Sequence, residues 1–195
     1  MPRTEEQFEE IREQKRALIM STSMELFAEE GYHNVSISKI ADKAGISKGL
    51  MYNYFKSKEA LIISIIEQGI EELFDLFDPN HDGYITDEEF VNFVRKSSRL
   101  VKENTRFWKL YFALFTQPKV YNLVEEKTQK VFSEMIELLT PFFSRRGIED
   151  PETEAVLFGA MLDGIAYNYV MNHGLFPLEN ITERIITRYI RNQKK

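Results

Sequence analysis

The segment Ser36–Lys58, which reads SISKIADKAGISKGLMYNYFKSK, constrains the fold of this chain more than any other part. In its first half apolar residues recur at helical spacing, the pattern of a helix that buries one face, and Ser36 is placed to cap that helix. Gly45 ends it, and Ser47 is placed to cap a second short helix over Lys48–Tyr54. Two helices joined by a short turn that contains glycine predict a helix-turn-helix.

The second of these helices carries large hydrogen-bond donors, namely Lys48, Tyr52 and Tyr54. A helix of this kind enters the major groove of DNA with its N-terminal residues at the base edges. The alternative is that the two tyrosines pack against the first helix of the chain. Because they are two residues apart on one helix, they cannot both pack fully on the same neighbour. We therefore expect Tyr52 to contact DNA.

The charge of the chain is distributed unevenly. The formal net charge is −6, which argues against DNA contact over the whole surface. Between Ser36 and Lys58, however, Asp42 is the only acid and stands against five lysines. A locally basic segment on an acidic chain predicts a protein that binds selected DNA sites and has little affinity for other DNA.

The run from residue 17 to residue 61, which includes LFAEEGYHNVSISKIADKAGISKGLMYNYFKSKEAL, resembles the DNA-binding head of the TetR/AcrR family of transcriptional regulators. The resemblance implies a helix-turn-helix DNA-binding domain over residues 1–56 and a helical effector-binding and dimerisation domain over residues 57–195. It implies base-edge contacts or near-base positions for Lys48, Gly49 and Tyr52. It implies phosphate contacts for Ser36, Ser38, Tyr54 and Lys58.

The rest of the chain also reads as helical. No segment shows the sustained alternation of a strand, so we predict an all-α fold with a three-helix N-terminal head and a helical C-terminal body. Pro141 is expected to lie beyond the end of the helix that precedes it. The helices expected outside the helix-turn-helix cover residues 9–30, 57–77, 87–103, 107–115, 120–139, 152–172 and 181–193.

The last two expected helices, residues 152–172 and 181–193, carry apolar residues on more than one stripe. The resemblance implies that these helices pair two subunits in a four-helix bundle, which would suit a palindromic operator. The alternative is that the apolar residues close the core of a single subunit. Both interpretations are open at this point.

Residues 78–89, DPNHDGYITDEE, resemble the twelve-residue calcium loop of an EF-hand. Gly83 stands where such a loop turns sharply, and every ligand position is filled. The candidate ligands are Asp78, Asn80, Asp82, Tyr84, Thr86 and Glu89. The same residue types also make an ordinary turn, in which Thr86 and Glu89 form a capping box for the next helix. The sequence therefore indicates either a Ca²⁺ site or a capped turn.

Aromatic residues gather in the predicted body, where they can form either a core or a ligand pocket. Stripes of aromatic residues at helical spacing usually form core. The resemblance implies instead that the body holds a small effector, and the polar tips of tyrosine and tryptophan would suit an amphipathic molecule. The candidate pocket residues are Phe107, Trp108, Tyr111, Phe112, Phe115, Met161, Tyr167 and Met171.

Several classes of function are disfavoured by composition. The chain has no cysteine, which excludes disulfides, thiolate metal sites and cysteine nucleophiles. Its three histidines are isolated and it lacks a glycine-rich phosphate loop, so we do not expect an enzyme or a required cofactor. The charged start does not read as a signal peptide, and no apolar run reaches the roughly twenty residues of a membrane span. We expect a cytoplasmic protein.

These observations together predict a homodimeric regulator, a repressor that binds double-stranded operator DNA and is released by a small-molecule effector. The alternative is a calcium-binding module of the EF-hand type in which DNA binding is lost or secondary.

Overall fold

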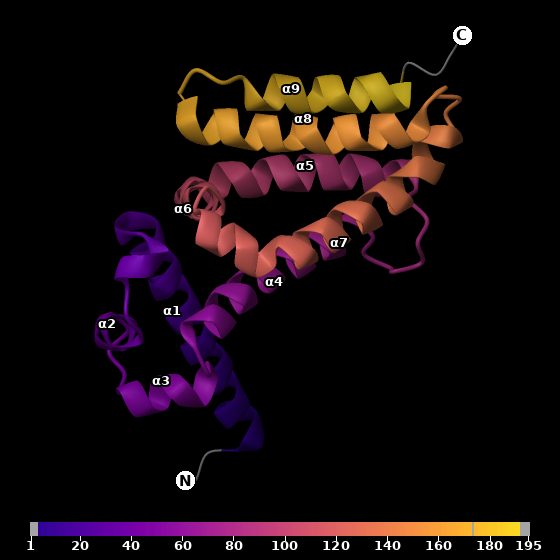
Figure 1. Ribbon diagram of the computed structural model, residues 1–195. Coiled ribbons are helices and arrows are strands. Elements are labelled where there is room, and N and C mark those ends of the chain that lie inside the picture. The colour runs from indigo at the N-terminus through magenta and orange to yellow at the C-terminus, as the bar shows by residue number, and fades with distance from the viewer. Residues whose placement is uncertain (1–3, 173, 192–195) are drawn as a thin grey trace. The chain divides into compact units, whose positions relative to one another are not determined.

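A computed structural model describes residues 4–172 and 174–191, with the side chains of residues 70–74 excepted. Over these residues the chain forms helices and no strand, so the all-α prediction is confirmed (Figure 1). None of these helices is long and apolar enough to cross a membrane. The helices are α1 (Glu5–Glu30), α2 (Ile37–Lys43), α3 (Lys48–Tyr54), α4 (Lys58–Phe77), α5 (Asp87–Glu103), α6 (Thr105–Phe115), α7 (Pro118–Ser144), α8 (Pro151–Asn172) and α9 (Leu178–Ile186).

Local capping sets several helix starts. The side chain of Ser47 accepts a hydrogen bond from the backbone N–H of Leu50 at 3.1 Å, which begins α3 at the residue predicted. α1 begins at Glu5 rather than near residue 9, because Thr4 and Gln7 form a capping box. The predicted last helix is interrupted: α9 ends at Ile186 and a π-helical turn follows to Arg191, while residues 192 and 193 lie outside the described part.

The prediction that the seventh helix ends before Pro141 is wrong, since α7 runs through this proline to Ser144. Proline removes one backbone hydrogen bond from a helix. The residues on either side of it, Leu139, Phe142 and Phe143, are fully buried in a hydrophobic core. This packing holds the helical turn despite the lost bond, because tertiary contacts contribute more to helix stability than local preference does.

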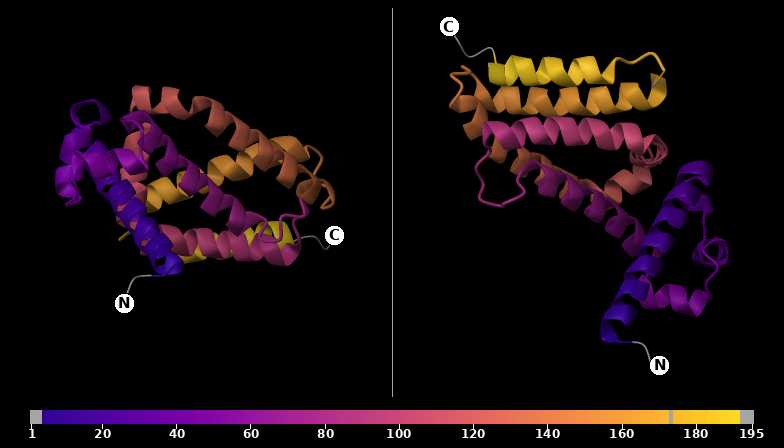
Figure 2. Two further views of the ribbon diagram at one scale, coloured as in Figure 1. Left: turned by 90° about the horizontal axis from the view of Figure 1, so that it is seen from below. Right: turned by 180° about the vertical axis from the view of Figure 1, so that it is seen from behind.

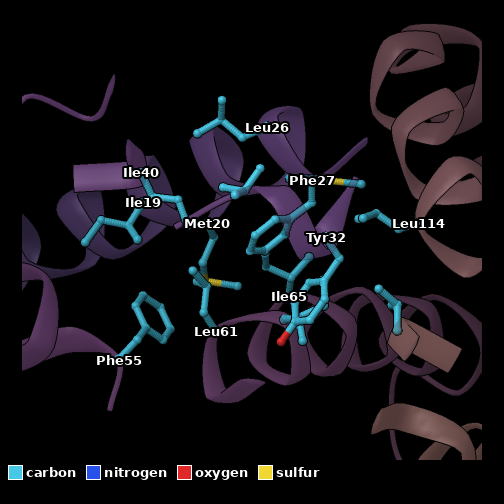
Figure 3. Packing of buried hydrophobic residues seen from close by; sticks show 14 of the residues in the cluster. Ile19, Met20, Leu26, Phe27, Tyr32, Ile40, Phe55, Leu61, Ile65 and Leu114 are labelled. Carbon is cyan, nitrogen blue, oxygen red and sulfur yellow. The ribbon is translucent and has the colours of Figure 1, made fainter. Parts of the chain in front are cut away.

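The chain divides into two compact units, and the first consists of Met1–Gln68 and Leu110–Val124. Phe27 and Tyr32, with ring centroids 5.1 Å apart, lie in its core together with Leu114 (Figure 3). The unit therefore contains the predicted helix-turn-helix and also a segment distant in sequence. The compact units do not follow the predicted division after residue 56.

Gln117 joins this distant segment to the head. Its side-chain oxygen accepts a hydrogen bond from the backbone N–H of Tyr32 at 2.7 Å, and its nitrogen donates to the carbonyl of Phe27 at 3.1 Å. Both partners belong to fully buried residues. One amide side chain thus satisfies two backbone groups at the end of α1, where water has little access.

The second unit consists of Gly69–Lys109 and Glu125–Lys195. α5, α8 and α9 run side by side in it (Figures 1 and 2). Phe90 lies in its core, stacked on Phe142 with ring centroids 4.5 Å apart, and Phe158 is 5.1 Å away. The apolar residues of α9 and the turn that follows it, including Ile185 and Tyr189, are buried in the same core. The apolar residues of α9 therefore contribute to the core of a single subunit.

We predict that Gln117→Leu lowers the free energy of unfolding by about 1 to 3 kcal/mol, because it leaves the buried N–H of Tyr32 without an acceptor. Urea denaturation of the whole chain measures this change. Gln129→Leu is the matched control, since Gln129 is exposed and its side chain reaches only Glu125 at 3.5 Å. Equal effects of the two substitutions would contradict the role assigned to Gln117.

Candidate nucleic-acid interface

The third helix of the head, α3, is held from one side. Met51 is fully buried in the first core and Phe55, at the end of the helix, is 2% exposed. Other positions of this helix are turned to solvent. Lys48, Gly49 and Tyr52 lie within about 100° of one another around the helix axis and are all exposed. The three residues predicted to lie at or near base edges therefore share one open surface, which we call the α3 face.

The two tyrosines of α3 take different positions. Tyr52 is 42% exposed. Tyr54 is half-buried and packs against the first core. Tyr54 thus packs within the head, while Tyr52 remains available to a ligand.

The start of α2 lies in the same unit as α3. The side chain of Ser36 accepts a hydrogen bond from the backbone N–H of Lys39 at 3.1 Å, so this serine caps α2 as expected. Ser36 is exposed and Ser38 is half-buried. Exposed N–H groups and hydroxyls at a helix start suit a phosphate oxygen.

Lys58 has partners within the chain, unlike the residues of the α3 face. Its Nζ donates to the carbonyl oxygens of Tyr32 at 2.7 Å and Val35 at 2.8 Å, and lies 4.4 Å from the centre of the Tyr32 ring. Burial lowers the pKa of Lys58, against the opposing effect of the neighbouring Glu59 carboxylate. Two of the three N–H donors of this ammonium group are therefore occupied. We leave Lys58 out of the proposed interface and regard it as an anchor of the turn between α1 and α2.

Acidic residues of α1 neutralise two of the remaining four lysines of the segment. Lys39 forms an ion pair with Glu30, and Lys43 forms one with Glu25 at 3.4 Å. Lys48 and Lys56 are exposed and pair with no acid among the described residues. The positive charge left for a nucleic acid is therefore smaller than the sequence count suggested, and part of it lies at the N-terminus of α3.

The candidate pocket residues divide between the two units. Tyr111, Phe112 and Phe115 belong to the first unit, where the Tyr111 and Phe115 rings lie 4.6 Å apart. Phe107 and Trp108 belong to the second, with ring centroids 5.7 Å apart. The three remaining candidates, Met161, Tyr167 and Met171, lie on α8, also in the second unit.

Those three residues of α8 do not share one environment. Met161 packs against the core of the second unit. Tyr167 and Met171 are exposed. Tyr167 and Met171 therefore lie on a solvent-facing part of α8 in the single chain, rather than in the core that Met161 contacts.

The EF-hand-like segment forms the connection between α4 and α5. Both hydrogen bonds of the Thr86–Glu89 capping box are present. As the side chains stand, no group of three or more acidic or histidine side chains in the described residues is arranged to hold a metal ion. The capped turn predicted as one alternative is therefore formed, with Asp78, Asn80, Asp82 and Tyr84 in the loop before it.

The head has three helices, and the last of them is partly packed on the core and exposes a lysine, a glycine and a tyrosine, which is the arrangement of a helix-turn-helix. Residues 19–65 match the model of the bacterial regulatory proteins of the tetR family. The matched residues run from α1 through the helix-turn-helix into α4. Residues 69–97 separately match the EF hand domain.

Characterised and uncharacterised regulators share the head with this chain. The HTH-type transcriptional regulator YuxN of Bacillus subtilis, itself uncharacterized, is 43% identical over 61 residues, which are 31% of this chain and 21% of the relative. The fatty acid metabolism regulator protein of Bacillus subtilis is 39% identical over 57 residues, 29% of each chain. The similarity thus spans less than a third of the length of these relatives.

The whole fold also has solved counterparts. FadR from Bacillus subtilis, in complex with stearoyl-CoA, aligns with a TM-score of 0.66 and 21% identity over 89% of this chain and 97% of FadR. NalD, the secondary repressor of the MexAB-OprM multidrug efflux pump in Pseudomonas aeruginosa, aligns with a TM-score of 0.67 and 18% identity over 93% of this chain and 96% of NalD. These likenesses establish the fold.

We predict that Lys58→Met lowers the free energy of unfolding by about 1 to 3 kcal/mol, because two carbonyls of the head lose a charged donor. Urea denaturation followed by circular dichroism measures the change. Lys56→Met makes the same substitution at an exposed lysine and should be nearly neutral. A Lys58→Met protein as stable as the Lys56→Met protein would show that the anchor contributes nothing.

Proposed function

We propose that this protein is a DNA-binding transcriptional regulator, a repressor that acts in the cytoplasm and reads DNA with the α3 face. The observation that carries this proposal is the joint exposure of Lys48, Gly49 and Tyr52 on a helix whose other side is buried. The match of residues 19–65 to the bacterial regulatory proteins of the tetR family supports it. The retention of this face argues against the alternative of a calcium-binding module without DNA binding.

Gly49 gives a second argument for close contact with DNA. Its φ angle lies outside the left-handed region, and an added Cβ would meet only the side-chain oxygen of Ser47, at 4.0 Å. Neither backbone conformation nor packing within the chain therefore requires glycine here, although glycine weakens a helix. A glycine on an exposed recognition helix lets the backbone approach the base edges. Lys48 beside it can donate to the O6 and N7 atoms of guanine.

We propose that two copies of the chain associate through α8. Apolar and small residues recur on this helix at spacings of three or four, and all are exposed except the half-buried Gly164: Val156, Ala160, Gly164, Tyr167 and Met171. A side chain at Gly164 would meet nothing within 4 Å, so the single chain does not require its small size. Small residues at the centre of such a face allow a second helix to approach closely, and a contiguous apolar face on a soluble chain often marks an interface. A two-fold dimer would present two α3 faces to a palindromic operator.

We further propose that a small amphipathic molecule releases the protein from DNA. The stearoyl-CoA bound by the structurally similar FadR is a molecule of this kind. Within the second unit, Trp108 is a partly exposed aromatic ring with a polar tip and is suited to bind such an effector. The chemical identity of the effector is a separate question from DNA binding and is tested by adding acyl-CoA esters to the protein–DNA complex.

We predict that Gly49→Leu and Tyr52→Ala each weaken binding to the DNA upstream of the protein's own gene by about tenfold or more, as expected for lost base-edge contacts. Fluorescence anisotropy over a salt series, with random DNA as competitor, measures this. Neither substitution should lower the stability of the head, since both sites are exposed. Tyr121→Ala removes an equally exposed tyrosine, 42% in each case, and should bind as the wild type does. Wild-type affinity in both α3 variants would remove the α3 face from the interface.

We predict that the wild type is a dimer at micromolar concentration and that Gly164→Leu and Tyr167→Glu are monomers with unchanged helix content. The added leucine blocks the approach of a second helix, and the added carboxylate would be buried without a partner. Sedimentation velocity measures the mass. Phe132→Glu, at a residue 47% exposed on α7 against 48% for Tyr167, is the control that should remain dimeric. Ile185 is unsuitable for this test, because it is buried in the single-chain core. A monomeric wild type would refute the dimer.

A further inference from the structure

Two ion pairs connect α1 to α2 in the head. Lys39 is paired with Glu30, the last residue of α1, and the Nζ of Lys43 lies 3.4 Å from a carboxylate oxygen of Glu25. The two lysines are four residues apart on α2 and therefore lie on the same side of that helix. Both pairs belong to the first compact unit, as α3 does. Carboxylates of α1 thus neutralise one side of α2.

The fold of the head does not require these pairs. Their four side chains are between 28% and 49% exposed, and ion pairs that are open to water contribute little to stability. α1 and α2 are already joined by apolar packing, because Ile40 and Ala41 are buried in the same core as Phe27. The lysines can therefore exchange partners without unfolding the head.

The position of Glu30 on α1 also departs from helical preference. Glu29 and Glu30 lie in the last turn of α1, which has no basic residue. The C-terminal end of a helix carries partial negative charge, so carboxylates are unfavourable there and lysine or arginine is preferred. Local helix stability therefore does not account for the acid at position 30, whose charge acts on Lys39.

The charge of α2 bears directly on DNA affinity. In a helix-turn-helix the first helix of the motif crosses the DNA backbone, while the second lies in the major groove. A free lysine on the first helix adds attraction to phosphates of any sequence. Lys39 and Lys43 are both exposed. A carboxylate that holds such a lysine competes with phosphate for the same ammonium group.

We propose that Glu25 and Glu30 compete with DNA phosphates for the lysines of α2. By holding these lysines, they lower the affinity of the head for DNA of every sequence. This inference rests on the proposed function, because it assigns a restraining contact to the same DNA-binding head. The α3 face keeps the choice of sequence, since Lys48 pairs with no acid in the described part of the chain. Different helices therefore set the strength of binding and the sequence that is bound.

The competition has a defined salt dependence. A free lysine that reaches a phosphate releases about one counterion from DNA, whereas a lysine that is already paired must exchange one partner for another. Freeing one lysine in each head should therefore steepen the slope of log affinity against log salt by about one unit for each lysine. The carboxylate that is left behind when its lysine turns to DNA also repels the phosphates, which adds to the effect of the pair.

The test measures DNA binding by the full chain. Glu25→Gln and Glu30→Gln should each raise the affinity by about threefold or more, and the two together by about tenfold or more. The gain should be equal for the DNA upstream of the protein's own gene and for a random duplex, unlike the change in Tyr52→Ala, which removes a base-edge contact. Fluorescence anisotropy over a salt series measures both the affinities and the slopes. Glutamine is a good helix former, so circular dichroism should show unchanged helix content.

Glu29→Gln is the matched control. It removes the same charge from the same turn of α1, at an exposed residue that pairs with no lysine in the described ranges, and should bind DNA as the wild type does. A second control adds Lys39→Gln to Glu30→Gln, and the gain should then disappear because no ammonium group is left to free. Equal gains in Glu29→Gln and Glu30→Gln would overturn the proposal, since they would indicate general repulsion by acidic residues. A gain that persists without Lys39 would overturn it as well.

The restraint and the proposed function can fail separately. If the wild type binds its upstream DNA but Glu25→Gln and Glu30→Gln bind it no more tightly, the carboxylates do not compete with phosphate and the DNA-binding function stands. If the folded wild type binds neither duplex at about 50 mM salt, the proposed function fails and the restraint fails with it.

Discussion

The first unit depends on the burial of one residue, Tyr32, at the end of α1. Its ring packs on Phe27, its backbone N–H is bound by Gln117 and its carbonyl by Lys58. Three segments that are far apart in the sequence therefore meet at one buried tyrosine. The same core buries Met51. Because α3 is fixed to this core through Met51, its exposed residues, on which the proposed DNA contact rests, stay turned to solvent.

Much of the local structure followed from short-range chemistry. Ser47 and Thr86 cap α3 and α5, and both helices begin at the predicted residues because a cap acts on its own first turn. Contacts between residues far apart in the sequence could not be predicted from local patterns. Gln117 lies 85 residues from Tyr32, and nothing in its neighbourhood marks it as a clamp. The continuation of α7 through Pro141 likewise depends on a core that a local pattern cannot describe.

The residues of the candidate interface could be predicted from the sequence, but the positive charge left on its lysines could not. The helix-turn-helix and the family resemblance pointed to Lys48, Gly49 and Tyr52, which the structure exposes together. A count of lysines, however, cannot reveal that α1 places Glu30 and Glu25 against two of them. Electrostatic partners depend on how helices pack. The burial of Asp78 likewise could not be predicted from a sequence that fits both an EF-hand loop and a capped turn.

α4 supplies buried residues to both compact units: Leu61 and Ile62 lie in the first core, and Phe77 lies in the second. Most of the stability of a helix in a protein comes from tertiary packing of this kind. If either core unfolds, the part of α4 that packs in it loses the contacts that keep it helical. The neighbouring turns of α4 then also unfold more easily. The two units are therefore expected to share one unfolding transition rather than to melt as separate domains. The slowest amide hydrogen exchange in α4 would then report the stability of the whole chain.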